Sequence, residues 1–252
     1  GVEQVANLLL AACKSALPCG FAWVSDCDRL RPGEFAGGCV VVTGDGVRFH
    51  ATQTILERAL HRIEAGADSG VDGVVLAVRD TLTQLDPAGE AAFKANAERH
   101  AGEIDALAAY ADRALASVPA ASRALVTAHD AFSYFGRAYT YEVHGIQGIS
   151  TESEAGLEQV EDLVKLTVER RIGAIFIESS VADRNIRALI EGAAAKGHKV
   201  EVGGELFSDA MGAPGTYEGT YIGMIDHNVT VITRALGGAA PERGLNSRLA
   251  RA

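Results

Sequence analysis

Segments patterned as strands alternate with segments patterned as helices from Ala124 to Leu236, and this alternation limits the fold more than any other feature. The strand-like runs are short and apolar, whereas the helix-like runs repeat apolar residues at three- and four-residue spacing. Such alternation predicts a parallel sheet covered by helices on both faces. Ligands of these sheets bind beyond the carboxyl ends of the strands. We therefore expect an α/β lobe with its binding site at that edge.

A long helix is expected before this lobe. Val74–Leu85 has a helical pattern, Asp86-Pro87 interrupts it, and a new helix should run from about Ala88 to Ser117. At 1.5 Å rise per residue, its length would be about 45 Å. The chain is thus predicted to contain an atypical or truncated N-terminal lobe, a helical connector with the long helix, a C-terminal α/β lobe and a flexible polar tail, at 1–73, 74–120, 121–238 and 239–252.

The composition limits the classes of molecule that the chain is expected to bind. The 252 residues are 48% apolar, which is ordinary for a folded protein with a sizeable core. With 33 acidic and 23 basic residues the formal net charge is −10, which argues against nucleic acid as a partner. No apolar run in the sequence approaches the length of a membrane span.

The cysteines fit no metal or redox motif. Their spacings match neither a zinc ribbon nor a Cys-x-x-Cys pair, so we interpret them as ordinary thiols or one or two local disulfides. Leu8–Cys13 is similar to a bacterial lipoprotein signal, in which Cys13 would be acylated, but it is short and follows Glu3 rather than basic residues. A Leu/Ala helix segment is the preferred interpretation. The four cysteines are Cys13, Cys19, Cys27 and Cys39.

Two loops at predicted strand ends each carry one good metal-ligand side chain. His129 lies in the stretch 125–137, and Asp209 lies in the stretch 203–212. An imidazole and a carboxylate on neighbouring loops suit Zn²⁺, Mn²⁺ or Fe²⁺ better than Ca²⁺ or Mg²⁺, which prefer oxygen ligands. The alternatives are a capping or simply hydrogen-bonded histidine and an aspartate that caps a helix.

The same part of the chain closely resembles the C-terminal lobe of the zinc/manganese substrate-binding proteins of ABC transporters. The segment Leu85–Pro119 resembles the long helix that joins the two lobes of that family, so the resemblance covers roughly residues 74–238. The motifs that carry it are Val126–Phe132, Gly148–Thr151, Phe176–Ser180, Gly203–Gly212 and Gly219–Tyr221.

The resemblance implies a two-lobed fold and a metal held between the lobes by two ligands from each. His129 and Asp209 would be the C-lobe pair, with Glu178 and Glu205 as supporting groups rather than ligands. The implied function is extracytoplasmic capture of Zn²⁺ or Mn²⁺ by a monomer in the periplasm or on the cell surface. The metal would then be delivered to a membrane ABC permease.

The N-terminal part departs from the family. The family's N-lobe supplies two histidines, each in an Asp-Pro-His motif, whereas Asp86-Pro87 is followed here by alanine. His50 is the candidate replacement for the first of these two histidines. His61 and His100 sit among charged residues and are expected to be solvated, and three histidines match no ligand position: His144, His198 and His227.

Two ligands form a poor site, because affinity depends on ligand number and enforced geometry. An alternative is therefore an interaction module that kept the fold and lost tight metal binding. A hydrolase is a third reading, since Asp130 and Ser133 accompany His129. No orienting third group, Walker lysine or dinucleotide fingerprint supports catalysis, so the chain is not expected to be an enzyme.

Overall fold

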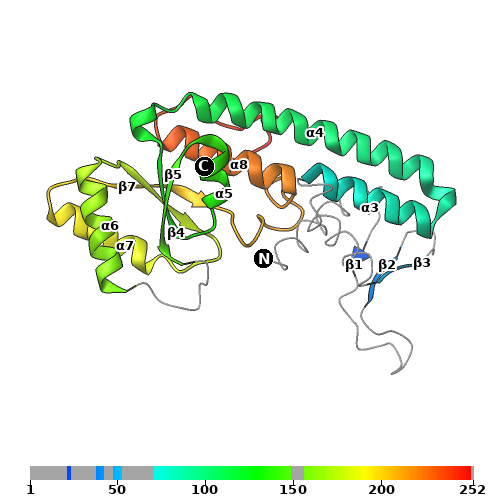
Figure 1. Cartoon of the computed structure of the whole chain (residues 1–252), viewed down its shortest axis with the longest axis horizontal. Coiled ribbons are helices and arrows are strands. Elements are labelled where there is room, and N and C mark those ends of the chain that lie inside the picture. Colours follow the sequence, from blue (N-terminus) through cyan, green and yellow to red (C-terminus); the bar gives the residue numbers. More distant parts are fainter. Residues whose placement is uncertain (1–21, 24–37, 43–47, 53–70, 149–155, 251–252) are drawn as a thin grey trace, which may run out of the picture. The chain divides into compact units, whose positions relative to one another are not determined.

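The structure is a computed structural model, and it describes residues 22–23, 38–42, 48–52, 71–148 and 156–250. The chain forms two compact units, Gly1–Asp105 and Ala106–Ala252, and the boundary falls within helix α4 (Glu90–Ala116) (Figure 1). Among the described helices, none is both long and apolar enough to cross a membrane.

The first unit contains a small antiparallel sheet and two consecutive helices. Its strands follow the order β1-β2-β3, with Val40 paired to His50 in the register. The helix break predicted at Asp86-Pro87 is confirmed, and the Asp86 carboxylate accepts a hydrogen bond from the Ala88 N–H at 3.2 Å. The elements among its described residues are β1 (Ala22–Trp23), β2 (Gly38–Val42), β3 (Arg48–Thr52), α3 (Val71–Leu85), η2 (Pro87–Gly89) and the first part of α4.

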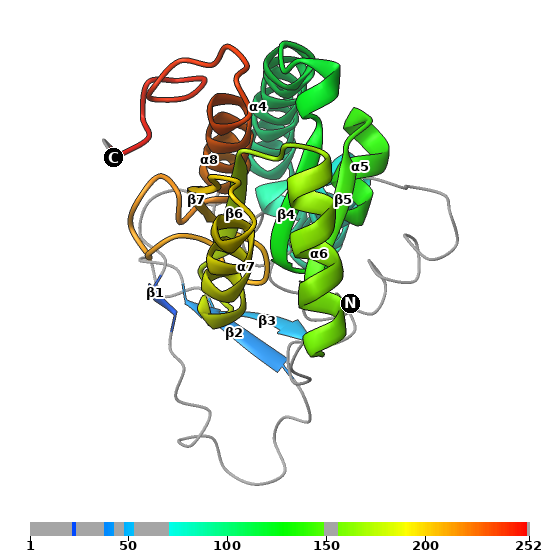
Figure 2. The same ribbon diagram turned by 90° about the vertical axis from the view of Figure 1, so that its left-hand side faces the viewer.

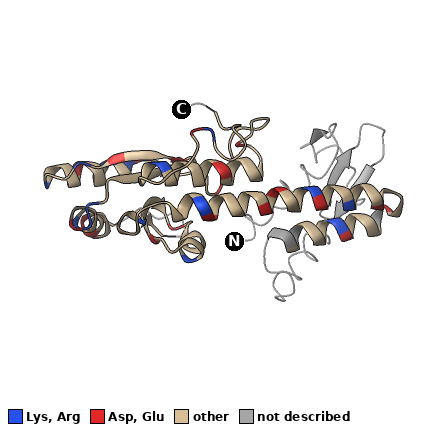
Figure 3. Cartoon of the chain, turned by 90° about the horizontal axis from the view of Figure 1, so that it is seen from above, with Lys and Arg blue, Asp and Glu red and all other residues tan. Residues whose placement is uncertain are grey.

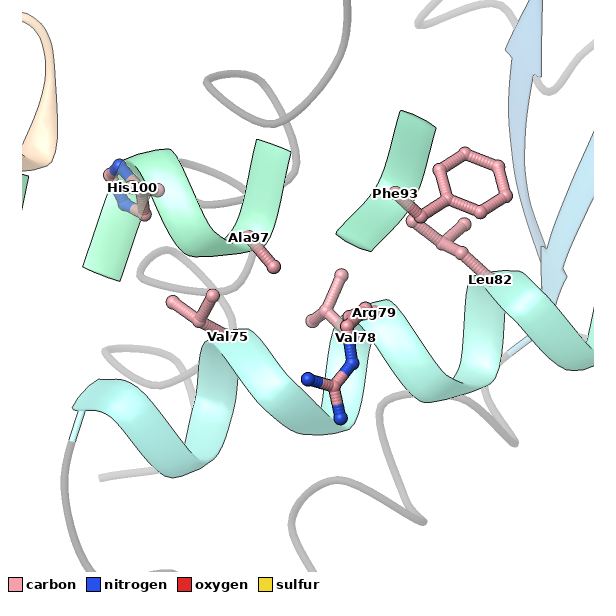
Figure 4. Close-up of a pocket in the computed structure, with 7 residues that line it drawn as sticks. All are labelled: Val75, Val78, Arg79, Leu82, Phe93, Ala97 and His100. Carbon is pink, nitrogen blue, oxygen red and sulfur yellow. The ribbon is translucent and has the colours of Figure 1, made fainter. Parts of the chain in front are cut away.

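Helices α3 and α4 pack against each other through an apolar face. The prediction that His100 is solvated is wrong, because this residue lies on that face of α4 and is only 2% exposed. Its Nδ1 lies 3.3 Å from a Glu103 carboxylate oxygen, at the edge of the packed face. Figure 4 shows the small pocket between the helices, which is lined by Val75, Val78, Arg79, Leu82, Phe93, Ala97 and His100.

The outward faces of these helices carry both signs of charge. Figure 3 shows acidic and basic residues interspersed along α4. Lys94 pairs with Glu90 at 2.6 Å and Arg99 pairs with Glu103 at 2.9 Å, each one helical turn apart. Such exposed pairs stabilise a helix by only a few tenths of a kcal/mol, about 0.3–0.5 each. Mixed charge of this kind suits solvation rather than recognition of a polyanion.

The second unit has the predicted α/β architecture. Strands β4 and β5 are parallel, as are β6 and β7, and the inner strands β4 and β6 pack next to each other. The helices cover this sheet layer (Figure 2), with α8 against β7. The described elements, after the last part of α4, are η3 (Ala120–Ser122), β4 (Ala124–His129), α5 (Ser133–Tyr139), β5 (Glu142–Gln147), α6 (Leu157–Glu169), β6 (Ala174–Glu178), α7 (Arg184–Ala195), β7 (Glu201–Leu206) and α8 (Tyr221–Ala235).

The core of this unit explains why β4 is buried along its whole length. Every residue of β4 is buried, including Thr127 and His129, because a parallel strand with helices on both sides has no solvent-facing side. Helices α6 and α7 contribute Leu163 and Leu189 to the same cluster. Packing on both sides fixes the position of β4, and therefore also the position of its last residue, His129.

The C-terminal segment, which we expected to be a flexible tail, makes defined contacts with the second unit. The Ala239 N–H donates to the Ser117 hydroxyl at 2.7 Å, and the Ala250 N–H donates to the Glu218 carboxylate at 2.7 Å. Leu249 is buried, with 3% of its surface exposed. The segment therefore packs against α8 and the loop that precedes it, although it contains no regular helix or strand between Ala239 and Ala250.

Candidate metal site

His129 is the last residue of β4. The sequence pattern placed this residue in a loop at the end of a strand, but it belongs to the strand itself and α5 begins only at Ser133, so the imidazole is held by a strand. Its backbone N–H donates to a Glu178 carboxylate oxygen at 2.9 Å. The next residue, Asp130, donates its N–H to the Gln147 carbonyl at 3.1 Å. The His129 backbone is thus fixed from two neighbouring strands.

A glycine on β5 allows the chain to turn away directly after His129. A Cβ atom at Gly145 would lie 2.6 Å from the Asp130 nitrogen and 2.8 Å from the His129 carbonyl carbon. Real Cβ atoms do not approach backbone this closely, so β5 can pass beneath the end of β4 only with glycine at this position.

Glu178 lies behind the imidazole, at the carboxyl end of β6. Its side chain is fully buried, and its Oε2 lies 2.9 Å from His129 Nδ1, within ion-pair distance although without the alignment of a full hydrogen bond. An ionised carboxylate only accepts hydrogen bonds, so this neighbour favours a proton on Nδ1. The other ring nitrogen, Nε2, is then available to bind a cation.

Asp209 faces this second nitrogen. It lies in the loop after β7, and its Oδ2 is 3.3 Å from His129 Nε2. The His129 side chain is 3% exposed, whereas that of Asp209 is 44% exposed, so solvent reaches the pair from the Asp209 side. The structure therefore places the side chains of His129 and Asp209 next to each other, although the two residues lie far apart in the sequence.

Asn228, on α8, fixes the start of the loop that carries Asp209. Its side-chain amide forms two hydrogen bonds with the backbone of Phe207: the Phe207 N–H donates to Oδ1 at 2.9 Å, and Nδ2 donates to the Phe207 carbonyl at 2.7 Å. Sequence reasoning missed this residue, because an asparagine inside an apolar helix pattern gives no sign of which backbone it contacts.

The remaining acidic and histidine candidates have other contacts. Glu205 is exposed, and it is its backbone carbonyl that accepts a hydrogen bond, from His227 Nε2 at 2.9 Å. His144 pairs with Glu142 at 3.1 Å, and His198 bonds the Ile172 carbonyl at 2.8 Å. Across the described ranges, no group of three or more His, Cys, Asp or Glu side chains is arranged to hold a metal ion. His50 lies in β3, and its part in a site stays a prediction.

The serine beside the pair does not form a nucleophile–base contact. The Ser133 hydroxyl donates to the Asp130 carboxylate at 2.6 Å, within the turn that leads into α5. This contact is typical of a residue near the start of a helix, and it directs the hydroxyl to a carboxylate instead of to the imidazole.

Replacing Glu178 by glutamine is expected to weaken metal binding by about tenfold to a hundredfold. One amide group cannot accept from the His129 N–H and also accept from Nδ1, so the glutamine NH₂ will favour a proton on Nε2, where the cation should bind. Titration with Zn²⁺ measures the affinity, and ¹⁵N-detected NMR of the imidazole reports the tautomer. Unchanged affinity with a changed tautomer would contradict the role of Glu178.

Comparison with known families decides the class of the chain. Residues 70–235 match the family described as ZnuA, zinc-uptake complex component A periplasmic. The chain belongs to the ZnuA family. The match covers the connector and the α/β unit, which includes His129, Glu178 and Asp209, and it confirms the resemblance inferred from the motifs.

Relatives of this ZnuA-family chain have transition metals in their names. It is 50% identical over 145 residues to the manganese-binding lipoprotein MntA of Bacillus subtilis, covering 58% of this chain and 47% of MntA. It is 48% identical over 162 residues to the zinc-binding protein TroA of Treponema pallidum, covering 64% of this chain and 53% of TroA. The chain thus spans about half the length of these curated relatives.

The solved structure of the periplasmic zinc-binding protein TroA from Treponema pallidum matches this chain with a TM-score of 0.63 at 47% identity, over 66% of this chain and 60% of TroA. This likeness confirms the predicted fold class, that of the two-lobed TroA-type binding proteins, with parallel strands flanked by helices.

Proposed function

We propose that this protein binds a divalent transition metal outside the cytoplasm, through His129 and Asp209, and passes it to an ABC permease. The observation that carries the proposal is the approach of an imidazole nitrogen and a carboxylate oxygen to 3.3 Å at the carboxyl end of the strands. The proposal is supported by membership of the ZnuA family and by relatives that are named for manganese or zinc.

The separation of the two atoms suits a shared ion. Zinc binds histidine nitrogen and carboxylate oxygen at about 2.0–2.2 Å, and a tetrahedral angle between two such bonds separates the ligand atoms by about 3.4 Å. His129 Nε2 and Asp209 Oδ2 therefore need only a small adjustment to share one cation. The buried carboxylate of Glu178 would strengthen the imidazole as a ligand from behind.

The choice of metal depends on ligands beyond this pair. Histidine favours zinc, and carboxylate ligands admit manganese and ferrous iron. One of each, as here, leaves Zn²⁺, Mn²⁺ and Fe²⁺ as candidate cargo. The metal is substrate in this proposal, so the half-site has to release it as well as bind it.

The second candidate function is an interaction module that kept the fold. It would apply if the pair of ligands among the described residues were the whole site. With two ligands a divalent ion would keep most of its water and bind weakly. Both proposals share the same α/β unit, and metal affinity separates them.

Calorimetric titration of the whole chain with Zn²⁺, Mn²⁺ and Fe²⁺ tests the proposal. We expect a dissociation constant below about 1 µM for at least one ion, and an increase of more than about tenfold in the Asp209→Ala variant. Asp183→Ala is the matched control, because that carboxylate is 45% exposed and lies in the same unit, paired with Arg187. Binding absent from the wild-type protein would favour the interaction module.

A further inference from the structure

Asp226 is a buried carboxylate that metal binding does not use. It lies on α8 and has no exposed surface. A buried carboxylate is stable only where hydrogen-bond donors surround it, so its neighbours identify what it holds. It is not one of the metal-ligand pair, and its hydrogen-bond donors include residues of the loop that carries Asp209 and of the C-terminal segment.

The donors to Asp226 come from separate parts of the second unit. The Tyr217 hydroxyl donates to Oδ2 at 3.0 Å, and the Leu245 N–H donates to Oδ1 at 2.9 Å. The Thr230 hydroxyl, one helical turn away, lies 3.3 Å from Oδ1 and also 2.7 Å from the Tyr110 hydroxyl on α4. The carboxylate thus links α8 and the C-terminal segment to Tyr217.

Tyr217 lies near the end of the Asp209 loop, which we define as residues 207–220. Burial, together with the nearby Asp226 carboxylate, raises the pKa of Tyr217 to about 12, so its hydroxyl remains a donor. The loop is closed on itself by the Gly212 N–H, which donates to the Glu218 carbonyl at 2.9 Å. Asn228 fixes the first residue of the loop, and the hydrogen bond between Tyr217 and Asp226 fixes its other end.

The C-terminal segment approaches Asp226 so closely that only glycine fits. Gly244 is buried and has φ +71°, and a Cβ atom there would lie 2.6 Å from Asp226 Oδ2. Beyond it, Arg248 lies over the Tyr217 ring at 4.4 Å from the ring centroid, and the Ala250 N–H donates to Glu218. The segment therefore covers the same end of the Asp209 loop that Asp226 holds.

We propose that Asp226 and the C-terminal segment 244–250 are positioning groups that hold Asp209 beside His129. The inference rests on the proposed function, because it matters only where Asp209 binds a metal. Its physical basis is that Asp209 is on a loop between two anchors, and an anchored loop loses less conformational entropy when it binds an ion. Release of the second anchor weakens binding without removing a ligand.

Two variants release this anchor from opposite sides. Asp226→Asn keeps the shape and places an NH₂ group against one of the donors, and Gly244→Ala drives the segment away from an intact carboxylate. Gly237→Ala is the matched control for Gly244→Ala, because Gly237 has φ +84° with no other heavy atom within 4 Å of an added Cβ. In both glycine variants an alanine must adopt a positive φ, which is unfavourable, but only Gly244→Ala disturbs Asp226.

Hydrogen exchange tests the anchor without any metal. We expect peptides from the Asp209 loop to exchange about tenfold faster in Asp226→Asn and Gly244→Ala than in the wild type and Gly237→Ala. Peptides from β6 should be unaffected in all of them. Unchanged exchange in the loop of both variants overturns the inference, whatever the protein does with metals.

A double-variant cycle then links the anchor to Asp209. We expect Asp226→Asn to weaken Zn²⁺ binding by about tenfold in the wild-type background and to have no effect in the Asp209→Ala background. An equal loss in both backgrounds overturns the positioning role. If the wild-type chain binds none of Zn²⁺, Mn²⁺ and Fe²⁺, the proposed function fails, and loop exchange alone decides whether Asp226 and the segment hold the loop.

Discussion

Replacing Gly223 by alanine is expected to lower the free energy of unfolding by about 3 kcal/mol. Gly223 lies in the first turn of α8, and a Cβ atom there would overlap the Tyr217 carbonyl oxygen and lie 2.9 Å from the Glu218 nitrogen. Backbone atoms cannot rotate away as a flexible side chain can. The end of the Asp209 loop or the start of α8 must therefore move, and contacts on both sides are lost.

Gly102→Ala is the matched control for this prediction. Gly102 also lies within a helix, α4, but nothing lies within 4 Å of an added Cβ. Alanine is the better helix former by about 1 kcal/mol, so Gly102→Ala should raise the free energy of unfolding while Gly223→Ala lowers it. Urea unfolding of both variants measures the contrast. A gain in stability for Gly223→Ala would show that the loop has room for the side chain.

The expected loss at Gly223 reflects how the site is built. His129 is carried by a strand, whose position the sheet determines, whereas Asp209 is carried by a loop. A loop must be fixed by contacts that are not part of a regular ladder. Here those contacts come from α8, through Asn228 at the start of the Asp209 loop and through the close approach of Gly223 at its end.

The sequence predicted the pairing of His129 and Asp209 because it depends on a general property of parallel sheets. The carboxyl ends of such strands meet at one edge, so residues that follow two buried strands approach each other even when they are far apart in the chain. The apolar runs of β4 and β6 also follow directly from burial on both faces. These features need no knowledge of individual contacts.

The residues that the sequence did not reveal act through single side-chain contacts. Asn228 and Asp226 are polar residues in a helix whose apolar pattern dominates, and their roles depend on the backbone that lies opposite. For His100 the error was the opposite one, because a buried residue was predicted to be exposed. Its charged neighbours indicated an exposed face, but the packing of α3 against α4 buries the imidazole. Tertiary packing determines the burial and the contacts of such side chains, and the local sequence pattern does not predict this packing.

Replacing His129 by alanine is expected to reduce Zn²⁺ or Mn²⁺ affinity by at least about a hundredfold, since the described half-site would keep one ligand. The variant should also lose stability, by about 3 kcal/mol, because the buried Glu178 carboxylate loses the ring beside it. Loss of binding alone could then reflect loss of the fold. His144→Ala, which removes a histidine 22% exposed and paired with Glu142, should change neither quantity.

The double variant His129→Ala/Glu178→Gln separates the two effects. Glutamine removes the buried charge and still accepts from the residue-129 N–H, so the double variant should recover most of the stability lost by His129→Ala. It should recover none of the metal affinity, because no imidazole remains to face Asp209. Thermal unfolding and calorimetry on the same samples measure both. If the double variant binds Zn²⁺ as tightly as the Glu178→Gln variant alone, Zn²⁺ binding does not depend on the His129 ring. The half-site would then have been assigned to the wrong residues.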